Sequence, residues 1–232
     1  MSKLTEIRAK ICRKWKKLRL QPIRVYCLHH VCAVFDAASM NRGDWMQIDE
    51  FKQKVQALRL DGVELISLAE AYRHTCEDRI RCKKYAVLTF DDGYASLKEI
   101  LPWLEGQKIP VTLFINGKYL DGKSYCKNPK ERYLTKDDLY TLYKLYPHLT
   151  IGSHGWEHNH VPGMTNEEFI ASVTRNVNLL QEHPSYIPFW AYTYGEHTQV
   201  SDENLRAQGI VPIYIDGLPN YNNQDVIHRE LL

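Results

Sequence analysis

Residues 86–97 read AVLTFDDGYASL, an apolar run that ends in two adjacent aspartates and a glycine. A continuous apolar run of this kind is typical of a strand that is buried on both faces, as in a parallel sheet. Two interpretations of Asp91 and Asp92 are open at this point. Either they form a turn in which a carboxylate accepts hydrogen bonds, or the strand delivers both carboxylates to one catalytic pocket. The groups that follow the other strands decide between these two interpretations.

Strands and helices alternate along the chain, which favours βαβ units and a parallel sheet. Helical spacing predicts helices over 49–60, 135–146 and 165–183, the last two capped by Thr135 and Thr165. Without a Gly-rich nucleotide loop, the expected strands favour a closed or nearly closed α/β barrel, in which catalytic groups collect at the carboxyl ends of the strands. The expected main strands are 23–30, 85–90, 109–116, 149–154, 186–195, 209–216 and 224–231.

The composition is that of an ordinary globular protein, with 44% hydrophobic and 25% charged residues and a net charge of only +2. So small a net charge predicts no nucleic-acid partner. The six cysteines form no C-x-x-C pair, which predicts reduced thiols rather than a zinc module or a disulfide framework. No apolar run approaches the ~20 residues of a membrane span, and no h-region follows the basic N-terminus. A cytoplasmic location is therefore expected.

Residues 1–22 form an expected basic amphipathic helix ahead of a domain that spans 23–232. Residues 1–20 hold eight Lys or Arg and a single acid, and apolar residues recur at steps of three or four. Such a helix either lies on the inner face of a membrane through residues 3–20, or packs on its own domain. The apolar positions are Leu4, Ile7, Ile11, Trp15 and Leu18.

Two histidines follow the expected strand 149–154. His154 and His158 are four residues apart, a spacing that on a helical turn places both imidazoles on one face. Two histidines and one carboxylate, with open coordination positions, suit a catalytic Zn²⁺, Fe²⁺, Co²⁺ or Ni²⁺. One of Asp91 and Asp92 could then bind the metal while the other serves as general base. With these histidines at a neighbouring strand end, the catalytic interpretation of the aspartates is favoured over the turn.

The segment LTFDDGY (88–94), followed by GSHGWEHNHV (152–161), resembles the polysaccharide deacetylase family, also called the NodB-homology domain or carbohydrate esterase family 4. CLHHV (27–31), IPVTLFI (109–115) and FWAYTYGE (189–196) extend the resemblance, which runs from about Ile23 to the end of the chain. The resemblance implies a distorted (β/α) barrel with about seven strands. It also implies a metal-dependent hydrolase of linear amides, which removes an N-acetyl group, or an O-acetyl or formyl group, from an amino sugar or polysaccharide precursor.

The same resemblance implies roles for individual residues. It makes Asp91 the catalytic base, and it makes Asp92, His154 and His158 the ligands of a divalent metal, with zinc expected first and cobalt, nickel or iron as alternatives. The backbone N–H of Tyr194 is implied to hold the oxyanion together with the metal.

The chain also departs from the family pattern. No arginine opens the third motif, where the family has one that orients the base, and Thr193 stands where proline is usual. His228 lies in the region that supplies the general acid, but VIHREL (226–231) is equally a strand whose Arg229 pairs structurally. His29 resembles the early Tyr-His position of the family and is either a pocket residue or an ordinary hydrogen-bonded histidine.

Two other functions stay open on the sequence. A degenerate deacetylase would bind a glycan without turning it over, and the missing arginine argues mildly for that alternative. A non-haem Fe²⁺ oxygenase would use both histidines and one carboxylate, but it leaves the second aspartate without a role. Because no leader is visible, a lipid-linked or nucleotide-linked amino-sugar precursor is the expected partner. The oligomeric state is not predicted.

Overall fold

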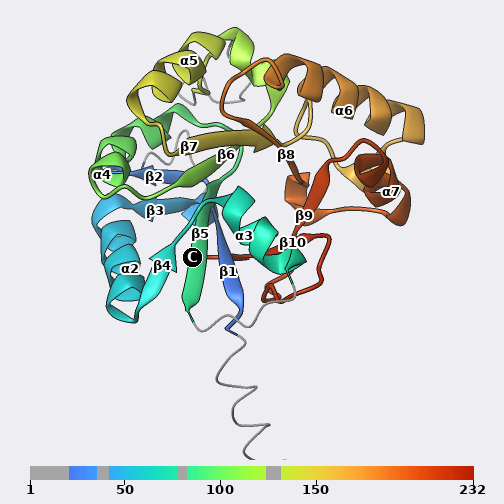
Figure 1. The fold of residues 1–232 in the computed structure, drawn as a ribbon. Coiled ribbons are helices and arrows are strands. Elements are labelled where there is room, and N and C mark those ends of the chain that lie inside the picture. Colours follow the sequence, from blue (N-terminus) through green and yellow to red (C-terminus); the bar gives the residue numbers. More distant parts are fainter. Residues whose placement is uncertain (1–20, 36–41, 78–82, 124–131) are drawn as a thin grey trace, which may run out of the picture.

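Seven parallel strands close into a barrel in the computed structural model, which describes all residues except 1–20, 36–41, 78–82 and 124–131 (Figure 1). The strand order is β1-β10-β9-β8-β7-β6-β5, and pairing of β5 with β1 closes the ring. The distorted (β/α) barrel expected from the sequence is confirmed. The strands are β1 (Ile23–Leu28), β5 (Lys84–Phe90), β6 (Val111–Ile115), β7 (Leu149–Ser153), β8 (Tyr186–Ala191), β9 (Val211–Ile215) and β10 (Ile227–Leu231).

Three further strands lie outside the ring. β4 (Val63–Leu65) pairs with β5 on its other edge, and β2 (His30–Cys32) pairs with β3 (Trp45–Gln47) in a separate two-stranded sheet. β2 follows β1 almost directly, so the chain leaves the barrel beside His29.

The contact between β1 and β5 positions the site. The last five residues of β5 are all buried, and the two strands pair over six residues, from Ile23 opposite Tyr85 to Leu28 opposite Phe90. The backbone N–H of Asp91 donates to the carbonyl oxygen of Leu28 at 2.9 Å, so the pairing continues one residue beyond β5. The carboxyl ends of both strands therefore meet at the same end of the barrel.

Helices surround the barrel (Figure 1). The predicted caps Thr135 and Thr165 are confirmed, since each forms a capping box at the start of its helix. The first predicted helix begins one residue earlier than expected, at Ile48, and Gln47 caps it. The helices are α2 (Ile48–Leu60), α3 (Leu68–Cys76), α4 (Leu101–Gly106), α5 (Lys136–Leu145), α6 (Asn166–Leu180) and α7 (Gln199–Ala207).

The predicted N-terminal amphipathic helix over residues 3–20 lies outside the described residues. Within the part of the chain that the structure describes, no helix combines the length and the apolar character needed to cross a membrane.

Candidate active site

A cavity of about 440 Å³ opens where the barrel strands end. It is lined by the two aspartates and two histidines that the sequence singled out, although they come from points far apart in the chain. Tyr194 also lines it, and nine further residues complete the lining. The aspartates and histidines are Asp91, Asp92, His154 and His158, and the nine further residues include Cys27, His29, Asp44 and Arg229.

The backbone at Asp92 explains how two adjacent residues both reach this cavity. Successive side chains of a strand point to opposite faces. Asp91 still pairs with β1, but Asp92 has φ 67° and Gly93 has φ 76°, both in the left-handed region. A non-glycine residue seldom adopts this conformation, which is costly and is found most often at functional sites. This turn ends the alternation of side chains between the two faces of the strand, so the carboxylates of Asp91 and Asp92 both line one pocket.

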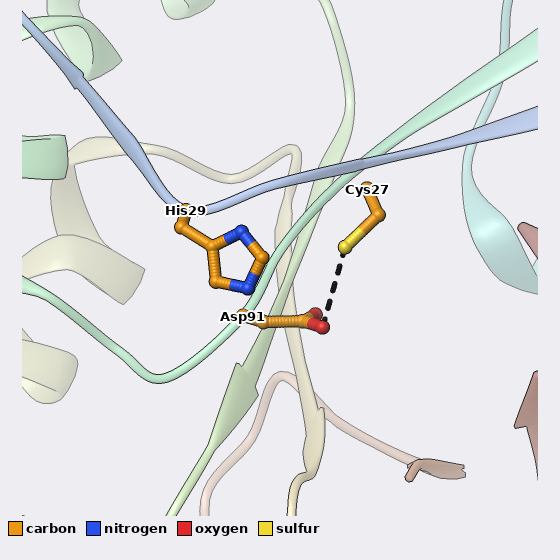
Figure 2. Close-up of side chains that lie close together, drawn as sticks. All are labelled: Cys27, His29 and Asp91. Atoms are coloured by element: carbon orange, nitrogen blue, oxygen red, sulfur yellow. Dashed lines mark hydrogen bonds between the residues drawn. The ribbon is translucent and has the colours of Figure 1, made fainter. Parts of the chain in front are cut away.

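Asp91 is held by a buried ion pair with Arg229. The guanidinium donates to both carboxylate oxygens, at 2.6 and 2.8 Å, and both side chains are almost fully buried. The Cys27 thiol donates to Oδ2 of Asp91 at 3.3 Å (Figure 2). Burial alone would raise the pKa of Asp91, but Arg229 outweighs it and lowers that pKa to about 2. Asp91 is therefore an oriented, ionised carboxylate at neutral pH.

The sequence analysis left open that Arg229 pairs structurally, and the structure identifies Asp91 as its partner. The family pattern places an arginine at the start of the third motif, whereas here Arg229 comes from β10, which neighbours β1 in the ring. In the sequence, Arg229 stands two residues after Ile227, a spacing that places both side chains on one face of a strand. In the structure both are buried. A buried arginine needs a negatively charged partner, and Asp91 is that partner.

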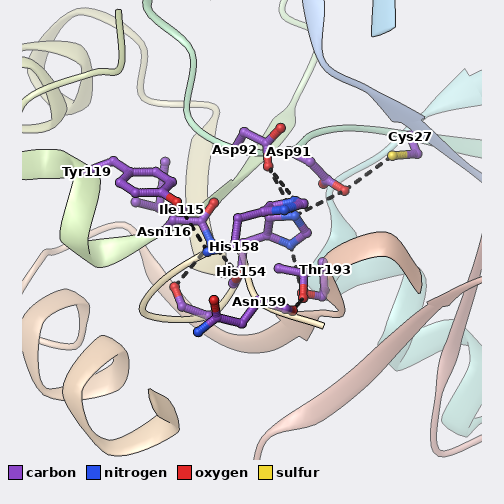
Figure 3. Close-up of polar contacts among 12 residues, drawn as sticks. Cys27, Asp91, Asp92, Ile115, Asn116, Tyr119, His154, His158, Asn159 and Thr193 are labelled. Carbon is purple, nitrogen blue, oxygen red and sulfur yellow. Dashed lines mark hydrogen bonds and ion pairs between the residues drawn. The ribbon is translucent and has the colours of Figure 1, made fainter. Parts of the chain in front are cut away.

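One carboxylate oxygen of Asp92 faces both histidines (Figure 3). This Oδ1 atom is 3.3 Å from Nε2 of His154 and 3.2 Å from Nε2 of His158. Among the described residues, this buried oxygen has no partner with hydrogen-bond geometry. Burial alone would raise the pKa of Asp92, but the two histidines hold that pKa well below its usual range. Three potential ligand atoms thus converge, and their spacing admits a shared cation.

The tautomer of His154 supports the same conclusion. Its Nδ1 lies 2.8 Å from the carbonyl oxygen of Ala191, which can only accept, so Nδ1 carries the proton. In the neutral imidazole, Nε2 then carries a lone pair on the side of Asp92. A backbone carbonyl that orients a histidine in this way is a regular feature of metal sites. Asp92, His154 and His158 therefore fit a divalent metal with open coordination positions.

The segment that carries His158 is not the helical turn that the sequence analysis assumed. Residues 154–160 form an irregular loop in which Gly155 has φ 89°. Buried side chains fix this loop: Asn116 donates to the carbonyl oxygen of His154, and Thr193 donates to that of Asn159 (Figure 3). The two imidazoles meet, with ring centroids 5.2 Å apart, because of this loop rather than through helical periodicity.

His228 is not among the residues that line the cavity. Its Nδ1 lies 2.7 Å from Oδ2 of Asp216, and its ring packs edge-on against Tyr214. Adjacent residues of a strand point to opposite faces, so His228 faces away from the pocket that Arg229 enters. This position does not favour His228 as the general acid, and that role stays an untested prediction. His29 lines the cavity and offers an imidazole beside Asp91.

Comparisons with known proteins identify the family and the fold. The family model described as polysaccharide deacetylase matches residues 78–213. No curated protein matches the chain. The solved structure of IcaB from Ammonifex degensii shares 22% identity with a TM-score of 0.77, covering 91% of this chain and 92% of that one.

Two further solved structures share the fold. A de-N-acetylase from Aggregatibacter actinomycetemcomitans is 16% identical with a TM-score of 0.74, covering 91% of this chain and 95% of its own. The deacetylase PplD from Streptococcus pyogenes was solved in complex with acetate. It is 18% identical with a TM-score of 0.69, covering 90% of this chain and 92% of that one. At these identities the likeness establishes the barrel.

Proposed function

Because this chain belongs to the polysaccharide deacetylase family, hydrolases that act on acetyl groups of polysaccharides, we propose that it removes the N-acetyl group from an amino sugar with the help of a divalent metal. Zinc is the first candidate, since two imidazoles and one carboxylate suit it well. The proposed substrate is a glycan or a lipid-linked or nucleotide-linked amino-sugar precursor. Contact of residues 3–20 with a membrane stays a prediction.

The observation that carries the proposal is the pairing of two differently placed carboxylates in one cavity. Oδ1 of Asp92 lies against two imidazole nitrogens and has no hydrogen-bond partner of good geometry among the described residues, whereas Asp91 is bonded twice by Arg229 and faces the same space. One carboxylate is placed to bind a cation, and the other stays free to accept a proton. A simple turn would need neither the buried arginine nor the converging histidines.

The residues of the chain divide the work of amide hydrolysis. A divalent metal held by Asp92, His154 and His158 would polarise the acyl oxygen and lower the pKa of the attacking water. Because the pKa of Asp91 is low, Asp91 can take a proton only from a water made acidic in this way. Asp91, oriented by Arg229, accepts the proton of that water. The backbone N–H of Tyr194, in a left-handed conformation with φ 56° at the cavity wall, is proposed to donate to the developing oxyanion.

The leaving amine must receive a proton, and His29 is the proposed donor. It replaces His228 in this role because it lines the cavity and lies beside Asp91. We expect His29→Ala to lower kcat by roughly 10²–10⁴-fold, the usual contribution of a general acid or base. We expect His228→Ala to keep most of the activity. Steady-state kinetics of both variants test this assignment. A larger loss of kcat in His228→Ala than in His29→Ala would return the role of general acid to His228.

The proposed function is tested by metal content and acetate release together. Purified protein is expected to hold one divalent metal per chain and to release acetate from at least one member of a panel of N-acetylated amino sugars. Asp92→Ala and His154→Ala are expected to lose both metal and release. His148→Ala, at an exposed histidine ahead of β7, is the matched control and should retain both.

The outcomes separate the alternatives. A wild-type protein that takes up no metal even after loading would contradict the proposal. Metal binding and glycan binding without release would favour the binding module. The sequence supported that alternative only through the missing arginine, and Arg229 now stands in contact with Asp91 in its place.

A further inference from the structure

A second group of metal-ligating side chains lies in the same cavity (Figure 2). The Sγ atom of Cys27, a ring nitrogen of His29 and a carboxylate oxygen of Asp91 all lie within 4.8 Å of one another. All three residues line the cavity. Cys27 lies near the end of β1, His29 directly follows β1 and Asp91 directly follows β5, so the β1–β5 pairing assembles the group.

We propose that Cys27, His29 and Asp91 form a second site for a thiophilic divalent cation such as Zn²⁺ or Cd²⁺, and that an ion bound there inhibits the enzyme. Thiolate, imidazole and carboxylate are the three ligand types that zinc takes in proteins. On binding, the S–H bond of Cys27 breaks, its proton passes to solvent and an Sγ–metal bond forms. No group is oxidised or reduced.

This site is expected to fill after the first one. Asp91 is already bonded through both oxygens to the Arg229 guanidinium, whose positive charge opposes a second cation. Asp92 has no such guanidinium partner and lies against two imidazoles instead. Cys27 must also give up the proton that it donates to Asp91. The first ion therefore goes to Asp92, His154 and His158, and only excess metal reaches Cys27.

Inhibition follows from which residues the second ion would occupy. Asp91 and His29 are the proposed base and acid, so this consequence rests on the proposed function. Hard cations such as Mg²⁺ prefer oxygen ligands and avoid thiolate. We therefore expect excess Zn²⁺ or Cd²⁺ to inhibit, whereas the same concentration of Mg²⁺ does not.

The binding test uses Cd²⁺, because a cadmium–thiolate bond gives an ultraviolet charge-transfer absorption that needs no activity. Cd²⁺ is titrated into the full chain as wild type, Cys27→Ser and Cys32→Ser. Cys32 is the matched control: it is also buried, in the neighbouring β2, but lies outside the group. The cysteines elsewhere in the chain are common to all three proteins and contribute the same background.

We expect wild type and Cys32→Ser to bind one more cadmium than Cys27→Ser, with the thiolate absorption that Cys27→Ser lacks. His29→Gln, which changes a partly exposed side chain, should weaken the second cadmium by at least about tenfold. It serves as the test if Cys27→Ser fails to fold. Equal stoichiometry and absorption in wild type and Cys27→Ser, or no weakening in His29→Gln, would overturn the proposal.

Two further measurements distinguish a failure of the second metal site from a failure of the proposed function. Asp92→Ala should lose the first cadmium and keep the thiolate absorption, so binding at the second site is measured even in a protein without activity. Where acetate release is measurable, Cys27→Ser should need at least about tenfold more excess Zn²⁺ for half inhibition than wild type. Equal sensitivity to zinc would refute the inhibitory role.

Discussion

Replacing Arg229 by methionine is expected to lower the free energy of unfolding by about 3–5 kcal/mol, because it leaves the buried Asp91 carboxylate without its counter-charge. Methionine keeps a similar length but offers no donor. Urea unfolding of wild type and variant measures the difference. The same substitution should lower kcat per folded chain, since Asp91 loses the two hydrogen bonds that orient it.

A second ion pair of β10 supplies the control. Glu230, the next residue, pairs with Arg24 at 3.0 Å, and the side chains of Arg24 and Glu230 are 42% and 27% exposed. Arg24→Met should cost only about 0.2–1 kcal/mol, as is usual for an exposed pair. In the double variant Arg229→Met/Asp91→Asn, neither member of the pair carries a charge, so part of the loss should be recovered. Equal costs for Arg24→Met and Arg229→Met would contradict this account.

The acid side of the stability curve gives an independent readout of the same pair. The pKa of an aspartate in an unfolded chain is ~3.9, whereas the pKa of Asp91 in the folded protein is about 2. A folded-state pKa below the unfolded one stabilises the protein fully above about pH 4, and the stabilisation is lost as the pH falls toward 2. This contribution, about 2–3 kcal/mol, should be absent from Arg229→Met.

Asp91→Asn is expected to lower kcat by roughly 10²–10⁴-fold while the metal content stays at the wild-type value. The amide has the shape of the carboxylate but cannot take a proton from the attacking water. The first metal site is made by Asp92, His154 and His158 and does not need this carboxylate. Rates are compared per folded chain, because Arg229 loses its counter-charge in this variant.

Asp44→Asn is the matched control for this substitution. Asp44 lines the same cavity, and its carboxylate makes no ion pair with another described residue. The variant removes a negative charge from the pocket without changing the proposed base, so kcat should stay near the wild-type value. Asp91→Asn activity close to that of wild type would move the role of base to another group.

Much of the fold could be predicted from local patterns. Apolar runs such as 85–90 and 109–116 are too short and too rich in β-formers for helices, and their alternation with helices predicted parallel strands. Polar groups at the ends of two such strands were enough to predict that Asp91, Asp92, His154 and His158 would meet, because parallel strands end at one edge. Local hydrogen bonding also marked the helix starts at Thr135 and Thr165.

Other features depend on which strands become neighbours. Closure of the ring places β10 beside β1, and this brings Arg229 to Asp91 across most of the chain length. The direction of a strand's side chains decides that Arg229 enters the pocket while His228 faces Asp216. The sequence by itself determined the barrel strands and the four residues at their ends. Only the tertiary structure decided that the Arg229 guanidinium orients Asp91 and that His29 and Cys27 lie beside this carboxylate. These contacts follow from strand register and barrel closure rather than from local spacing in the sequence.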